Sequence, residues 1–141
     1  MRLRVVVDLC LLVLAILLGV GSFFSWFIQM VSGQAYPTKG IQDWHGYGWM
    51  TLVLAIVIVV VVVADLSQPS VTTRAVAAAL FGASGVISVF FALQYVAFAS
   101  TAQLPTSLGW GLDLCMGVGV VGLGLGSFAA MLGRHSPQPA S

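Results

Sequence analysis

Four long runs of apolar residues constrain the fold of this chain more than any other feature. A helix needs about 20 apolar residues to cross the hydrocarbon core of a bilayer, and an isolated strand cannot satisfy its backbone hydrogen bonds there. The runs predict membrane-spanning helices at about 5–30, 48–65, 75–99 and 108–132. We therefore expect an all-α membrane protein, a four-helix bundle with a longer outer loop between the first two helices.

The same runs predict a single domain over residues 1–134, followed by a proline-containing tail at 135–141 that we expect to be disordered. Charged residues make up only 6% of the 141 residues, whereas hydrophobic residues make up 60%. A soluble domain is typically about 25% charged, so this composition excludes a cytosolic enzyme, a secreted domain and a disordered chain. A net charge of +1 provides no basic field for nucleic acid.

The distribution of basic residues predicts the orientation of the bundle. Cytoplasmic loops of membrane proteins carry an excess of lysine and arginine. In a four-span arrangement, Lys39 falls on one side of the membrane and four arginines fall on the other: Arg2, Arg4, Arg74 and Arg134. We expect a multi-pass protein of the bacterial plasma membrane with both termini in the cytoplasm.

The tryptophans lie at or beyond the outer ends of the predicted spans. They are Trp26, Trp44, Trp49 and Trp110. Amphipathic rings favour the headgroup layer of a bilayer, but a belt on one side only suggests that the outer segments also pack together. We expect a small outer aromatic cap, with plain interfacial anchoring as the alternative.

Small residues form a stripe along the fourth run at intervals of four and three residues, and Gly119, Gly122 and Gly126 belong to it. Such stripes allow close contact between helices in lipid. The first and third runs carry similar stripes, whereas the second has almost no small residues, so we expect the second helix to be peripheral. The segment 117–122 also matches the glycine pattern of dinucleotide loops, but it lacks the preceding strand that this motif needs. We expect no nucleotide.

Two acidic residues lie within the predicted spans, where ionisable groups are functional candidates by default. Asp8 lies about one turn inside the inner boundary of the first span. We expect it to form an ion pair with a nearby arginine, for which the candidates are Arg4, Arg2 and Arg74.

Asp113 lies about one turn below Trp110 in the fourth span. We expect a buried pair that holds the outer loop against the bundle, and a proton or cation relay and a catalytic acid are the alternatives. Its candidate partners are Lys39, His45, Ser22 and Thr51.

The remaining chemistry-bearing residues are too few or too far apart to form a reactive centre. His45 and His135 fall on opposite sides of the membrane, which excludes a haem held by two histidines. Asp43 and His45 supply two metal ligands at most, whereas structural zinc needs four. No hydroxyl nucleophile has a base nearby. We expect no catalytic residue, no cofactor, no metal and no enzyme activity.

The segment 22–27, Ser-Phe-Phe-Ser-Trp-Phe, is followed by a polar loop and then by Gly-Tyr-Gly-Trp at 46–49. This arrangement resembles that of small four-helix integral membrane proteins of bacteria, of actinobacterial type and of uncharacterised function. The resemblance covers roughly residues 20–64 and implies no particular activity.

These observations predict a non-catalytic accessory or assembly subunit of a larger cell-envelope membrane complex, with the lipid bilayer and other membrane subunits as partners. The alternative is a small homo-oligomeric transporter or lipid-binding protein, with Asp113 and the outer aromatic cap as its site. A transporter should place polar residues at mid-membrane depth, where this chain offers little beyond Ser84 and Ser88.

Overall fold

The computed structural model describes residues 2–42, 46–102 and 105–134. Its elements in chain order are α1 (Arg2–Phe23), β1 (Ser25–Val31), β2 (Gln34–Lys39), a 3-10 helix η1 (Gly40–Gln42), α2 (Tyr47–Ser67), α3 (Val71–Ala102), β3 (Thr106–Leu108) and α4 (Trp110–Arg134). All four α-helices are long and apolar enough to cross a membrane, which confirms the predicted set of candidate spans.

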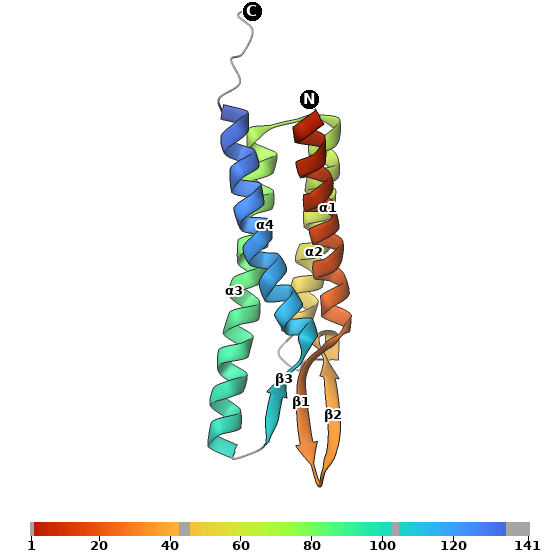
Figure 1. Ribbon diagram of the computed structural model, residues 1–141, viewed down its shortest axis with the longest axis vertical. Coiled ribbons are helices and arrows are strands. Elements are labelled where there is room, and N and C mark those ends of the chain that lie inside the picture. The colour runs from red at the N-terminus through yellow and green to blue at the C-terminus, as the bar shows by residue number, and fades with distance from the viewer. Residues whose placement is uncertain (1, 43–45, 103–104, 135–141) are drawn as a thin grey trace, which may run out of the picture.

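The four helices pack side by side as a bundle (Figure 1). The start of α1 and the end of α4 lie together at one end, here called the terminal end, and the strands lie at the other, the sheet end. Helix α1 contacts α2 and α4, and α3 also contacts both α2 and α4, with the α3–α4 contact the most extensive.

Helix α2 is therefore not peripheral, contrary to the expectation from its lack of small residues. Its buried positions recur at intervals of three and four residues and include Thr51, Ala55, Ile58 and Val62. This spacing places them on one face of the helix. Branched side chains fill this face at Ile58 and Val62, whereas Ala55 packs close to Gly19 of α1.

The prediction of an all-α fold is wrong at the sheet end, where three strands form an antiparallel sheet in the order β2-β1-β3. The first span was expected to continue to about residue 30, but α1 ends at Phe23 and the next residues form β1. The β1–β2 hairpin turns at Ser32 and Gly33, whose φ angles are 52° and 81°. Two positive φ angles are typical of a type I′ turn, which matches the twist of the paired strands.

The sheet is joined directly to the bundle. The amide of Gly109, just before α4, donates to the carbonyl of Trp26 in β1 at 2.8 Å, and the amide of Gly40 donates to the carbonyl of Phe24 at 3.1 Å. Helix α3 has 32 residues and is about 48 Å long at about 1.5 Å per residue. It exceeds the hydrocarbon core of about 30 Å and runs on beside the strands (Figure 1).

The glycine stripe of α4 lies against α3. A Cβ atom added at Gly119 would lie 2.6 Å from Cα of Gly85, and one added at Gly126 would lie 2.9 Å from Cβ of Ala78. At Gly122 it would overlap the ring of Phe81. The absence of side chains at these three positions allows the backbones of α3 and α4 to approach closely.

We predict that Gly119→Ala lowers the free energy of unfolding by about 1–3 kcal/mol, because the added methyl group collides with rigid backbone and forces the helices apart. The control is Gly124→Ala on the same helix, where an added Cβ has no neighbour within 4 Å. Thermal unfolding in detergent micelles measures both variants, and equal melting temperatures would contradict the packing role of Gly119.

Candidate functional site, a buried charged cluster at the terminal end

The short turn between α2 and α3 positions the first carboxylate of the cluster. Asp65 lies in the last turn of α2, and its Oδ1 atom accepts hydrogen bonds from the amide of Ser70, at 2.8 Å, and from the hydroxyl of Thr73. Ser70 in turn accepts from the amide of Thr72 at 3.1 Å and caps the start of α3. Asp65 therefore fixes the end of one helix to the beginning of the next.

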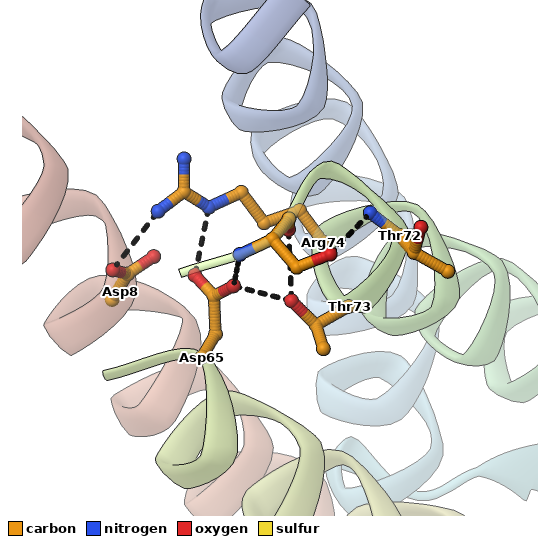
Figure 2. A network of polar contacts seen from close by, with 6 residues as sticks. Asp8, Asp65, Thr72, Thr73 and Arg74 are labelled. Atoms are coloured by element: carbon orange, nitrogen blue, oxygen red, sulfur yellow. Dashed lines mark hydrogen bonds and ion pairs between the residues drawn. The ribbon is translucent and has the colours of Figure 1, made fainter. Parts of the chain in front are cut away.

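Arg74, in the first turn of α3, connects this turn to α1 (Figure 2). Its Nε atom donates to Oδ2 of Asp65 at 2.7 Å, and its Nη2 atom lies 3.5 Å from Oδ2 of Asp8. The exposed fractions of Asp8, Asp65 and Arg74 are 4%, 3% and 4%. One guanidinium thus lies between two carboxylates and joins three helices in a site almost closed to solvent.

The pairing of Asp8 with Arg74 uses one of the three arginines that the sequence offers, whereas Asp65 was not anticipated. Asp65 lies at the end of the second apolar run, where an acidic residue is typical of a solvent-exposed loop. The sequence does contain a signal for the Asp65–Arg74 pair, because only eight residues separate the two across a turn that contains Pro69. A turn this short brings an acid at one helix end close to a base at the next helix start.

The cluster is suited to holding the three helices together. Opposite charges attract one another strongly where water is excluded, and removal of one partner leaves the other buried without compensation. Among the residues described, no three His, Cys, Asp or Glu side chains come close enough to hold a metal ion. The histidines and Asp43 lie outside the described residues.

Asp113 does not form the expected buried pair. It is exposed in the first turn of α4, where the helix dipole favours a negative charge. Two of its expected partners bond to each other instead, with the hydroxyls of Ser22 and Thr51 2.9 Å apart. Within the described part of the chain Asp113 makes no ion pair, and Lys39 is itself exposed.

Of the four tryptophans expected in the cap, the structure describes three, and among these only Trp26 is buried. Trp26 is fully buried, and its Nε1 atom donates to the carbonyl of Gly21 at 3.1 Å. Trp49 and Trp110 are 56% and 54% exposed, and Trp44 lies outside the described residues. The ring of Trp26 contacts that of Phe91, with centroids 5.1 Å apart. Phe91 in turn contacts three further rings, those of Phe27, Tyr47 and Tyr95.

The serines in the middle of α3 are satisfied by their own helix. Ser84 donates to the carbonyl of Phe81 at 2.8 Å, and Ser88 donates to the carbonyl of Ser84 at 2.9 Å. Both serines are fully buried. Their hydroxyls are therefore engaged locally, and they do not form the start of a polar track through the bundle.

The seam between α3 and α4 carries two shallow apolar grooves on its outer surface. One has a volume of about 400 Å³ and includes Gly82, Gly85 and Gly119 among its lining residues. The other has a volume of about 340 Å³ and lies nearer the terminal end, and Leu123 borders both.

Comparison with known proteins assigns no family to this chain. No protein-family model matches the sequence, and no curated protein matches it.

We predict that Asp65→Asn lowers the free energy of unfolding by about 3–5 kcal/mol, because it removes the close counter-ion of a buried arginine. Asp8→Asn should cost less, because Asp8 faces Arg74 across a longer distance. Asp113→Asn is the exposed control and should change stability by no more than about 0.5 kcal/mol. Unfolding in mixed micelles gives the free energy for all three variants. If Asp8→Asn and Asp65→Asn lowered it equally, the closer pairing of Asp65 with Arg74 would not be the stronger one.

Proposed function

We propose that this chain is a non-catalytic accessory or assembly subunit of a larger cell-envelope membrane complex in the bacterial plasma membrane. In this proposal both termini are cytoplasmic. The positions of the arginines support this orientation, because Arg2 and Arg4 begin α1, Arg74 lies at the start of α3 and Arg134 ends α4. Lys39 belongs to the sheet end.

The observation that carries the proposal is the apolar surface of the sheet end. Helix α3 extends beyond the length of a bilayer core, and its last turns expose Val96 and Phe98, at 55% and 58%. The hairpin exposes Met30, Val31 and Tyr36, at 44%, 49% and 52%. Exposed apolar side chains gathered at one end of a molecule are typical of a surface that contacts a partner protein or a membrane.

The charge distribution at the sheet end supports the same proposal. Lys39 is the only charged residue of the sheet among the residues described. Depletion of charge is typical of the buried centre of a protein interface. A partner subunit that covers this surface would remove the exposed side chains of the hairpin and of α3 from water.

The interior of the bundle favours a structural role over a transport role. The buried hydroxyls of Ser84 and Ser88 bond to their own helix, and those of Ser22 and Thr51 bond to each other. Within the described ranges, the buried charges are gathered in one cluster at the terminal end. A conduit would need polar groups spread across the depth of the membrane.

One observation favours the alternative, a homo-oligomeric transporter or lipid-binding protein. The grooves along the α3–α4 seam are large and apolar, and they are deepened by the small residues that line them. This shape suits a hydrocarbon chain or a helix of a second copy.

We predict that a photo-crosslinking amino acid at Val96 or Phe98 captures one partner protein of fixed mass in intact cells. The matched control is Val60 in the middle of α2, which is 62% exposed and should react with lipid alone. Mass spectrometry of the crosslinked products, with native purification through a C-terminal tag, identifies the partner and its stoichiometry. Products with lipid at all three positions, or with a second copy of the chain only, would reject the accessory-subunit proposal in favour of the alternative.

A further inference from the structure

A small cavity lies beside the charged cluster, between α1, α3 and α4. Its volume is about 10 Å³, and its lining includes Arg4 and Asp8 from α1, Arg74 from α3, and Ala129 from α4. Charged side chains therefore form part of the lining, and apolar side chains, which include Ala129, form the rest. The cavity lies outside the direct contact between Arg74 and Asp65.

The second observation is a buried hydrogen-bond donor at this cavity. The Nη2 atom of Arg74 is excluded from solvent and makes no hydrogen bond within the described residues. Its separation of 3.5 Å from Oδ2 of Asp8 is an ion-pair distance, but it is too long for a good N–H···O hydrogen bond. A buried donor left in this state lowers stability, so the site favours an acceptor that lies beside these two groups, on the side of the cavity.

The size and chemistry of the cavity select its occupant. A volume of about 10–15 Å³ accommodates one water molecule, provided that it has two or more polar partners. A cation would face the positive charges of Arg4 and Arg74, and an anion would face the carboxylate of Asp8 in a space no larger than one water molecule. A neutral molecule that both accepts and donates satisfies the two groups together.

We propose that this cavity is a binding site for one water molecule, which accepts a hydrogen bond from Nη2 of Arg74 and donates one to the carboxylate of Asp8. The two carboxylates then hold Arg74 in different ways. Asp65 bonds to it directly and closes the α2–α3 turn, whereas Asp8 is linked to it through solvent. Helix α1 is joined to the other two helices by an exchangeable bridge.

An isosteric pair of substitutions at Ala129 tests this site, because Thr and Val have the same shape and differ in one hydroxyl group. Ala129 lines the cavity and is 3% exposed. Both side chains displace the water and crowd the site equally, so the difference between them reports its polarity. We expect Ala129→Thr to melt at a higher temperature than Ala129→Val, because the Thr hydroxyl replaces the bonds of the water.

The same pair at Ala130 is the control, since Ala130 lines the apolar groove on the α3–α4 seam instead. There Val should equal or exceed Thr in melting temperature. An order at position 129 that matches the order at position 130 would overturn the proposal, because a dry apolar cavity favours the methyl group at both positions.

A high-resolution structure of the unmodified chain in lipid nanodiscs provides an independent readout. We expect a density peak within hydrogen-bond distance of both Nη2 of Arg74 and the Asp8 carboxylate. A direct contact between these two groups, with no room for a peak, would also overturn the proposal. Neither readout depends on the partner complex proposed above.

Discussion

The burial of one guanidinium is the constraint on which the rest of the bundle depends. Arg74 is placed where water hardly reaches it, so its charge must be balanced by the protein. Asp65 supplies the close counter-ion from α2, and Asp8 supplies a second carboxylate from α1. Three of the four helices are therefore fixed relative to one another at the terminal end by a single side chain.

The fourth helix is held by a different physical means. Apolar side chains gain little by leaving lipid for protein, so helices in a membrane associate through close packing and hydrogen bonds. In α4 the glycines bring its backbone against α3, and Gly111 brings it against Gly21 of α1. The bundle thus combines an electrostatic contact at one end, backbone contact along the α3–α4 seam and a small sheet at the other end.

The sequence was sufficient to predict the four spans and the glycine stripe, because run length and residue size act locally. It was insufficient for β1, since the apolar run continues from α1 through Val31 without a charge to mark the change. Its composition, with Trp26, Phe27 and Ile28, and the Ser-Gly pair that follows are typical of a hairpin. An analysis based on the length of the apolar run alone misses both the strand composition and the turn.

The residues of the candidate site were likewise predictable only in part. The role of Asp8 followed from its depth in the membrane, whereas that of Asp65 depends on how α2 and α3 meet across their turn. Asp113 shows the reverse error, because a position within an apolar run says nothing about which side of the helix faces its neighbours. The structure places Asp113 on the outer side of α4.

The direct joining of the sheet to the helices has a mechanical consequence. Only Phe24 separates α1 from β1, and only Gly109 separates β3 from α4. The two strands are paired with each other, and their helices are in contact. A displacement of β1 therefore cannot reach α1 alone, because the paired strand β3 carries it to α4 as well.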